Sequence, residues 1–320
     1  RRRPGQPEAT RRLAELRTRA RPRTALHRDA SGQSDRLSIR RTGVEQHLPV
    51  GYGRGALLLR AEAQEYEAAG VQPDVRVQRP GVGARYRFAD WGELNAHLQA
   101  ERADVRAGAG AAPDGLDFRD RAPATYDAWL TLWPSDVLRL DVAANRATFD
   151  NVRSLAGGIV ADGLTLSADV LPSERARFTA RAGRAAYSDG NRRLWGQGEA
   201  EYRLLANPRL SVGARSTAMN FARQLDHGYF NPRRYVSHVA TARASGGFLG
   251  RGWYEVDGSG GHEVVWPGGG KPLWSAGARA TWQLWRGVEL EGRAFHFSSR
   301  VASSGGFART GGGVSLRTAW

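Results

Sequence analysis

The chain has 320 residues, a formal net charge of +15 at pH 7 and a pI of about 11.1. It contains no cysteine, which excludes disulfide frameworks, thiolate nucleophiles and cysteine-based zinc sites. No run approaches the roughly 18–20 apolar residues of a membrane-spanning helix. That test does not detect β-barrels, whose strands need only about 10 alternating residues.

The N-terminal segment has helical character. In Pro7–Ala20, Leu13 and Leu16 lie three residues apart among good helix formers, and Pro22 ends the pattern. The opening sequence has no apolar core of the kind found in signal peptides. We therefore expect residues 1–21 to be a helical segment or linker, and the first residue to be an interior point of a longer protein.

From residue 22 onward the pattern changes to a period of two. One face of each predicted strand is small and apolar with aromatic residues near its ends, and the other face is charged and polar. Many of these strands run about 11–13 residues, against roughly 5–6 in globular sheets. The pattern predicts sixteen strands, near residues 22–30, 35–46, 54–65, 73–87, 93–101, 125–133, 136–147, 161–171, 175–187, 192–205, 208–220, 234–248, 251–264, 272–284, 287–299 and 307–320.

The predicted connectors alternate between short and longer. Short turns such as 171–175 and 249–252 are separated by longer stretches such as 102–124 and 222–234. This layout is typical of outer-membrane barrels, in which the short turns lie on the periplasmic side. We expect an all-β fold, a transmembrane antiparallel barrel of about sixteen strands over residues 22–320, in the bacterial outer membrane.

The last strand supports this interpretation. Val314, Leu316, Thr318 and Trp320 share one face, and in a closed barrel that face contacts lipid while the strand pairs with the first one. Trp320 is expected at the periplasmic interface, among aromatic residues. A terminal aromatic after alternating apolar residues also resembles the signal read by the barrel insertion machinery, which we assign to Val314, Leu316 and Trp320.

The polar face is expected to line an aqueous lumen and the substrate path. Pairs such as Glu199 and Glu201 could serve as the paired acids of a glycosidase. They share their face with many arginines, however, so we interpret them as part of a cross-strand ladder of ion pairs. The predicted lumen residues are Arg139, Asp141, Arg175, Arg177, Arg181, Trp195, Glu199, Glu201, Arg203, Arg215, Arg243, Trp253, Glu255, Asp257, Arg279, Glu289, Glu291 and Arg293.

Other candidate chemistry is weak. The seven histidines are scattered, with no His-x-x-x-His pair, and "GGGKP" (268–272) lacks the spacing of a phosphate-binding loop. The arginine-rich start is not interleaved with aromatic residues, as binding of single-stranded nucleic acid would require. We therefore expect no metal, no cofactor, no nucleic-acid partner and no enzymatic activity.

Residues 148–205, and above all "YSDGNR" (187–192) and "YFNPRRY" (229–235), resemble the C-terminal barrels of bacterial exopolysaccharide exporters. The nearest types are the poly-N-acetylglucosamine export porin and the cellulose export subunit. The resemblance implies that periplasmic tetratricopeptide repeats lead into a sixteen-stranded barrel, with residues 1–21 as the end of those repeats. The implied partners are an exopolysaccharide chain, outer-membrane lipid, the insertion machinery, the periplasmic repeat region and an inner-membrane synthase complex.

The expected function is therefore a pore that exports an exopolysaccharide. Mixed signs on the polar face, with arginine in slight excess, favour a neutral or anionic polymer, and connectors 102–124 and 222–234 are long enough to fold inward and gate. The alternative is a receptor or adhesin barrel with a closed lumen, like a related barrel in a phage-adsorption protein. A lipid-modifying hydrolase would need a serine partner for His227 and Asp226, and none is evident.

Overall fold

The computed structural model describes residues 21–34, 36–51, 54–68, 74–106, 120–299 and 308–320. The predicted helix over residues 7–20 lies outside them. Within this part of the chain there is one short helix, α2 (Val152–Ala156). The strands are β1 (Arg23–Gln33), β2 (Leu37–Val50), β3 (Gly55–Ala68), β4 (Asp74–Ala89), β5 (Gly92–Ala100), β6 (Arg102–Arg106), β7 (Ala124–Ser135), β8 (Leu138–Thr148), β9 (Val160–Val170), β10 (Ala176–Tyr187), β11 (Arg192–Ala206), β12 (Arg209–Phe221), β13 (Arg234–Phe248), β14 (Gly252–Trp266), β15 (Gly269–Trp285), β16 (Val288–Phe297) and β17 (Arg309–Ala319).

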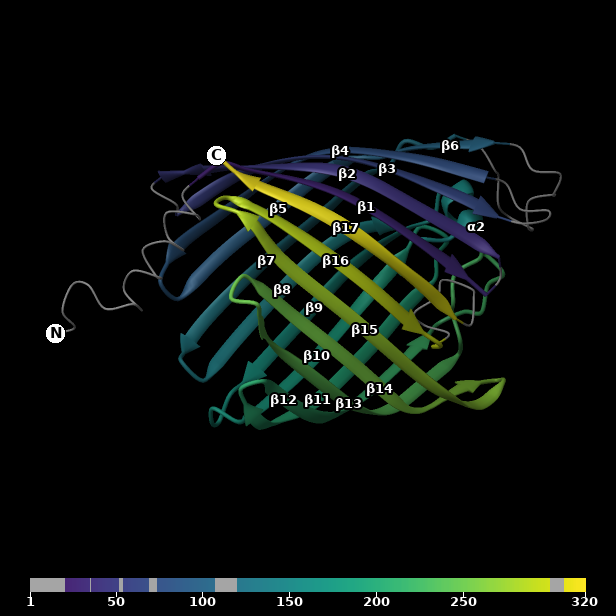
Figure 1. Cartoon of the computed structure of the whole chain (residues 1–320). Helices are drawn as coiled ribbons and strands as arrows, with labels where there is room; N and C mark the ends of the chain where they lie inside the picture. Colours follow the sequence, from purple (N-terminus) through teal and green to yellow (C-terminus); the bar gives the residue numbers. More distant parts are fainter. Residues whose placement is uncertain (1–20, 35, 52–53, 69–73, 107–119, 300–307) are drawn as a thin grey trace, which may run out of the picture.

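These strands close into a single antiparallel barrel (Figure 1). The first strand, β1, pairs with β2 on one side and with β17 on the other, in a register that places Leu26 opposite Leu316. Closure leaves no open sheet edge, which is the condition for a β-structure to cross lipid. The predicted all-β barrel is therefore confirmed.

The barrel wall is built from sixteen strand positions, which we call staves. Both β5 and β6 pair with β4, and they are separated only by Glu101, so they form one interrupted stave. The strand predicted over 93–101 thus continues to Arg106, and the predicted connector 102–124 was wrong in its first five residues. Of the rest of that connector, residues 107–119 lie outside the described part of the chain.

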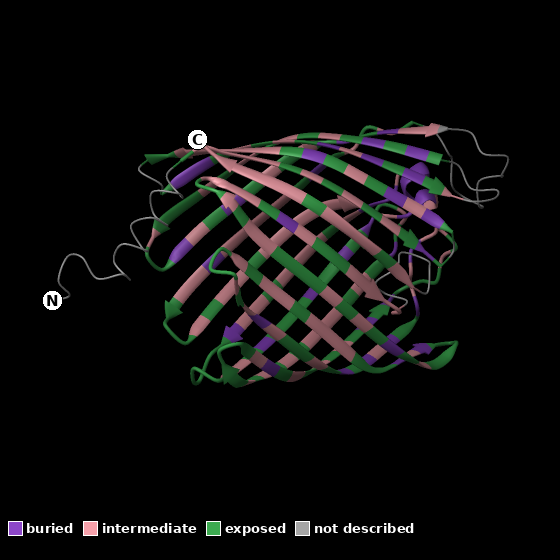
Figure 2. Cartoon of the chain, in the orientation of Figure 1, coloured by how far each residue is buried: buried purple, intermediate pink, exposed green. Residues whose placement is uncertain are grey.

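Burial alternates along the strands as the period of two predicts (Figure 2). Large apolar side chains such as Leu26, Val82 and Leu166 are exposed on the outer face. Residues on the inner face of the same strands carry charge or hydroxyl groups, as in Asp29 on β1 and Ser167 on β9. An outward apolar face and a polar interior reverse the usual arrangement of a globular sheet, and they match a barrel surrounded by lipid.

The two ends of the barrel differ. One end holds the C-terminus, the start of β1 and short turns such as Asp136–Val137 between β7 and β8. The other end holds α2 and the segments 149–159 and 222–233. By the usual layout of such barrels the first end is periplasmic and the second extracellular. No helix in the described ranges is long and apolar enough to cross a membrane.

Two apolar clusters lie inside the extracellular end. The first packs Val152 and Leu155 of α2 against inward residues of β2, β3, β4 and β6, including Ile39, Tyr66 and Val77. The second joins Ile159 and Tyr229 to inward residues of β10, β12, β13 and β14. The barrel is thus filled with packed side chains at this end and lined with charged side chains along its length.

Candidate functional site

The inner wall carries a ladder of ion pairs. Glu291 lies 2.7 Å from Arg279 and 3.0 Å from Arg317, which also reaches Glu289 at 2.8 Å. Arg293 pairs across the barrel seam with Asp29 at 2.6 Å. Since neighbouring staves place these side chains on one face, the ladder follows from strand register and needs no loop to assemble it.

A second part of the ladder lies on β11 to β14. Arg243 is placed between Glu201, at 3.7 Å, and Glu255, at 3.9 Å. Arg209 also approaches Glu201, at 3.5 Å. The carboxylate pairs that could have served a glycosidase are therefore shared with guanidinium groups in this part of the wall.

The remaining predicted lumen residues are on the same wall. Arg177 pairs with Asp169, Arg139 with Asp141, and Arg203 with Glu174. Glu199, Arg215 and Asp257 line a small cavity together with Glu201 and Arg243. The rest follow by position: Arg181, Trp195 and Trp253 share the inward face of their strands, and Arg175 lies in the turn that precedes β10.

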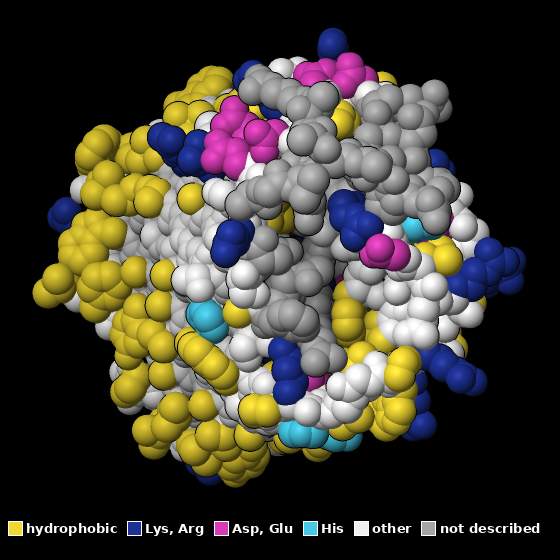
Figure 3. Space-filling model, turned by 90° about the vertical axis from the view of Figure 1, so that its right-hand side faces the viewer, with side chains coloured by type: hydrophobic (Ala, Val, Ile, Leu, Met, Phe, Trp, Pro, Cys, Tyr) yellow, Lys and Arg dark blue, Asp and Glu magenta, His cyan; other side chains and the backbone are white. Residues whose placement is uncertain are grey.

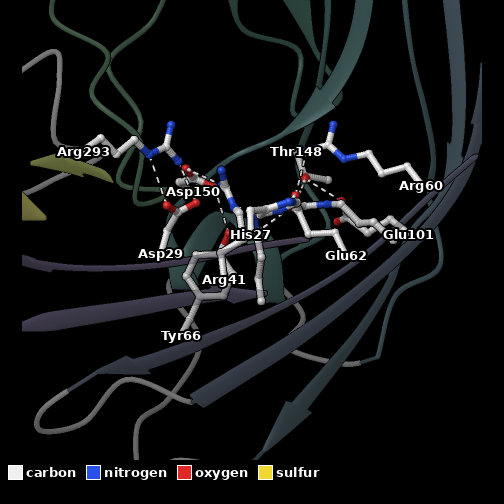
Figure 4. A network of polar contacts seen from close by, with 12 residues as sticks. His27, Asp29, Arg41, Arg60, Glu62, Tyr66, Glu101, Thr148, Asp150 and Arg293 are labelled. Carbon is white, nitrogen blue, oxygen red and sulfur yellow. Dashed lines mark hydrogen bonds and ion pairs between the residues drawn. The ribbon is translucent and has the colours of Figure 1, made fainter. Parts of the chain in front are cut away.

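A buried charge of the lumen, Glu62 of β3, has a side chain that is 5 % exposed (Figure 4). Its carboxylate lies 2.7 Å from Arg60, 3.4 Å from Arg79 and 3.5 Å from Arg41. The His27 ring approaches it at 3.6 Å. One carboxylate thus balances three guanidinium groups from three neighbouring strands, β2, β3 and β4.

The polar network continues to the end of β8 and the first residues of the segment 149–159. Arg79 pairs with Glu101, which accepts a hydrogen bond from the Thr148 hydroxyl at 2.8 Å. Asp150 accepts one from the Tyr66 hydroxyl at 2.8 Å and lies 3.6 Å from Arg41. The end of β8 is therefore connected to the opposite part of the wall by polar contacts, which Figure 4 shows.

The segment 149–159 crosses the interior at the extracellular end. Asp150 reaches Arg309 of β17 at 3.7 Å, α2 packs on β4 and β6, and Ile159 joins the cluster beside β10 to β14. The side chain of Asn151 caps α2 by accepting hydrogen bonds from the backbone amides of Arg153 and Ser154. This segment therefore contacts several parts of the wall from inside the barrel. The sequence predicted only a longer connector here.

The loop 222–233 holds that segment from the other side. Arg153 forms a bidentate pair with Asp226, at 2.9 and 3.0 Å, and the Ser154 hydroxyl donates to the backbone oxygen of His227. The prediction that this loop folds inward agrees with these contacts; its role in gating remains a prediction. Asp226 pairs with Arg153 and the ring of His227 pairs with Asp189, so Asp226 does not orient His227.

The turn 188–191 anchors the same loop. Asp189 hydrogen-bonds with the His227 ring at 2.9 Å and accepts the Tyr229 hydroxyl at 2.7 Å. Burial tends to raise the pKa of Asp189, but these hydrogen bonds, with one from the Asn191 amide, outweigh it and leave the pKa lowered. Burial and the Asp189 carboxylate raise the pKa of Tyr229, which keeps its phenol neutral.

The extracellular end presents both apolar and charged groups. In Figure 3 hydrophobic side chains gather along the left and lower margin, and arginine and acidic side chains lie on the end face and at its other edges. This is the distribution expected of a channel mouth surrounded by lipid. The described residues contain no group of three or more side chains suited to hold a metal ion.

Sequence reasoning missed the network on β1 to β5. It named no lumen residue before Arg139, although Arg60, Glu62 and Gln64 alternate on β3. That alternation was the available signal. It was weak, because Glu65 and Glu67 on the outward face of the same strand are charged too.

Residues 119–251 match the family model described as the PgaA membrane beta barrel domain. The chain matches no curated protein sequence. The fold is similar to that of a bacterial polysaccharide outer membrane secretin, with a TM-score of 0.70 and 11% identity over 94% of this chain and 99% of that one.

Other structures are similar at lower TM-score. For the CymD monoaromatic hydrocarbon channel it is 0.53, with 10% identity over 95% of this chain and 90% of that one. For CdiB from Acinetobacter baumannii the TM-score is 0.52, with 10% identity over 93% of this chain and 60% of that one. Together with the apolar outer face, the match to a membrane barrel domain indicates a β-barrel of the bacterial outer membrane.

Proposed function

We propose that the barrel exports a secreted polysaccharide through its charged lumen. The observation that carries the proposal is the band of paired charges on the inner wall, from Glu289 near the periplasmic turns to Glu101 near the extracellular end. The match to the PgaA membrane beta barrel domain supports it, as does the likeness to a polysaccharide secretin. Sugar hydroxyl groups can exchange hydrogen bonds along such a wall without binding tightly at any point, which sustained movement requires.

The inner wall favours a neutral or anionic polymer. Its acidic residues are largely paired with guanidinium groups, as in Glu62, Glu201 and Glu291. Arg181 and Arg215 face inward with no carboxylate within ion-pair distance among the described residues. A cationic polymer would therefore meet arginine-rich surroundings, whereas an acidic one would meet cations.

Conductance tests the proposal. The refolded full chain is inserted in a planar bilayer, and single-channel current and reversal potential are measured under a salt gradient. We expect steady conductance that neutral or uronic-acid oligosaccharides block reversibly and that glucosamine oligomers block less. Stronger block by the cationic oligomers would overturn the substrate class and leave the pore in place.

A second candidate function is a receptor or adhesin whose lumen is closed. The segment 149–159 favours it, because α2 and Asp150 are fixed to several staves at the extracellular end. Conductance separates the two proposals. A receptor is silent as the unmodified chain and conducts only after residues 150–158 are replaced by a flexible glycine–serine linker, whereas an exporter conducts without that replacement.

The partners in this proposal are those implied by the resemblance to bacterial exopolysaccharide exporters. The periplasmic repeat region and a synthase complex in the inner membrane would deliver the polymer to the short-turn end. Val314 and Leu316, on the outward face of β17, and Trp320, which follows that strand, would serve as the signal for the insertion machinery. Pull-down of the insertion machinery by a β17 peptide, compared with a peptide in which Trp320 is alanine, tests that role.

A further inference from the structure

Two neighbouring grooves lie on the outer wall at the extracellular end. The first, of about 730 Å³, is bounded by Leu194, Asn220, Val236 and Trp266. The second, of about 660 Å³, lies over β9 to β12 and shares Leu194 and Asn220 with the first. Both are mainly apolar, and both lie on the face that contacts lipid. The pore proposal makes no use of them.

Each groove has its own pair of arginines. Arg233 and Arg234 line the first groove, and Arg184 and Arg192 line the second. All four are exposed, and no ion pair forms on any of them among the described residues. The one carboxylate in either lining is Asp162, which lies 3.3 Å from Arg146 on β8.

One arginine of each pair, Arg184 and Arg234, belongs to a row that crosses five neighbouring strands, β10 to β14. The strand registers place Arg184 opposite Leu194, Leu194 opposite Asn220, Asn220 opposite Arg234, and Arg234 opposite Trp266. The guanidinium group of Arg234 lies over the Trp266 ring, 4.9 Å from its centroid. Since staves are about 4.8 Å apart, the two arginine pairs are separated by roughly 14 Å along the rim.

Arginine on the lipid face needs an explanation. It costs about 2–4 kcal/mol at the middle of a bilayer and close to nothing at the interface, so these residues mark the level of the headgroups. A guanidinium group binds phosphate through two parallel hydrogen bonds. Four such groups without an acidic partner, above apolar grooves, therefore fit a lipid that carries phosphate at two separated points.

We propose that these grooves bind a phosphorylated, multiply acylated glycolipid of the outer leaflet, of the lipopolysaccharide class. One phosphate is held by Arg184 and Arg192 and the other by Arg233 and Arg234, and acyl chains lie in the grooves beside Leu194 and Trp266. A lipid with one phosphate engages only one of the two pairs. The proposal requires only that the barrel lies in the outer membrane, so it is independent of what crosses the lumen.

Native mass spectrometry of the delipidated full chain in detergent tests this. The titrants are bis-phosphorylated lipid A, the same lipid after removal of its phosphates, and phosphatidylglycerol. We expect one bis-phosphorylated molecule per barrel and a Kd that rises about tenfold for each pair from which one arginine is removed, hence about a hundredfold in the variant R184Q/R234Q. Circular dichroism and heat-dependent gel mobility confirm that each variant is folded.

The matched control is R28Q/R76Q. Arg28 and Arg76 also point outward and are exposed, on β1 and β4, away from both grooves. This variant should bind bis-phosphorylated lipid A as the unmodified chain does. Equal binding of the dephosphorylated lipid or of phosphatidylglycerol would overturn the proposal. An equal loss of lipid A binding in R184Q/R234Q and in R28Q/R76Q would overturn it too.

Discussion

Glu62 is the residue on which the lumen network depends most. Its carboxylate is shared by Arg60, Arg79 and Arg41 at 2.7–3.5 Å, and its side chain is nearly inaccessible. Removing one partner of a buried charge cluster leaves the others uncompensated. We expect Glu62→Gln to lower the free energy of unfolding by on the order of 3 kcal/mol, measured by urea unfolding in lipid vesicles, and to shift the reversal potential toward anion selectivity.

The control for that prediction lies on the same strand. Glu67 pairs with Arg40 at 3.0 Å on the outward face, and both side chains are about half exposed. Exposed pairs contribute about 0–1 kcal/mol, so Glu67→Gln should leave both stability and selectivity near those of the unmodified chain. Equal effects of the two substitutions would show that burial of Glu62 has no energetic consequence.

Asp189 makes the extracellular loop sensitive to acid. Its pKa is lowered in the folded state, so its contribution to stability is complete above the ordinary aspartate pKa of about 3.9 and is lost as pH falls through the folded value. We expect loop 222–233 to become cleavable by pepsin as pH falls below about 4, whereas hydrogen exchange in the barrel strands stays slow.

Asp189→Asn provides the comparison for that pH effect. The amide can no longer act as a charged acceptor for His227 and Tyr229. The protection of loop 222–233 against hydrogen exchange, relative to the intrinsic rate at each pH, should then be low at neutral pH and nearly independent of pH. A pH dependence unchanged by the substitution would place the sensitive group elsewhere.

At the scale of elements, α2 and loop 222–233 are held together by a close backbone approach. Gly228 has φ of +90°, and a Cβ there would lie 2.3 Å from Asn151 Oδ1 and 2.7 Å from Arg153 Cβ. Gly228→Ala should therefore separate the loop from the segment 149–159, at a cost of about 1–3 kcal/mol. If that segment narrows the pore, single-channel recordings should show longer or larger openings.

Gly198→Ala is the matched substitution for Gly228→Ala. A Cβ at Gly198 meets nothing within 4 Å, and its φ is not in the left-handed region. Recordings from this variant should match the unmodified chain. Unchanged recordings from Gly228→Ala as well would mean that the segment does not limit the current.

The strands were predictable because their signal is local. The period of two placed a strand over 125–133, where β7 runs from Ala124 to Ser135, and it identified inward residues such as Arg243 and Glu291. The interior segment was not predictable in the same way. Its position depends on contacts of Asp150 with Arg41 and Arg309, which lie far from it in the sequence. The alternation of apolar and polar residues along a strand gives no information about contacts between residues far apart in the sequence.

At the scale of the whole molecule, barrel closure makes the two faces of β17 unequal. Leu316 points outward between Leu26 and Leu290 of the neighbouring strands, whereas Ser315 points inward between His27 and Glu291. Two adjacent residues therefore sample lipid and water. The same charge placed at each position tests the orientation of the barrel wall.

We expect Leu316→Arg to destabilise the barrel by about 2 kcal/mol, because the guanidinium group would enter the lipid-facing band. Ser315→Arg should be nearly neutral, since it adds a cation to a wet interior beside Glu291. Folding into vesicles, followed by heat-dependent gel mobility across a urea series, measures both. If the inward substitution were the more damaging one, the assignment of the polar face to the lumen would be wrong. In that case the charged ladder would have to face something other than water, and the proposed transport path would no longer be possible.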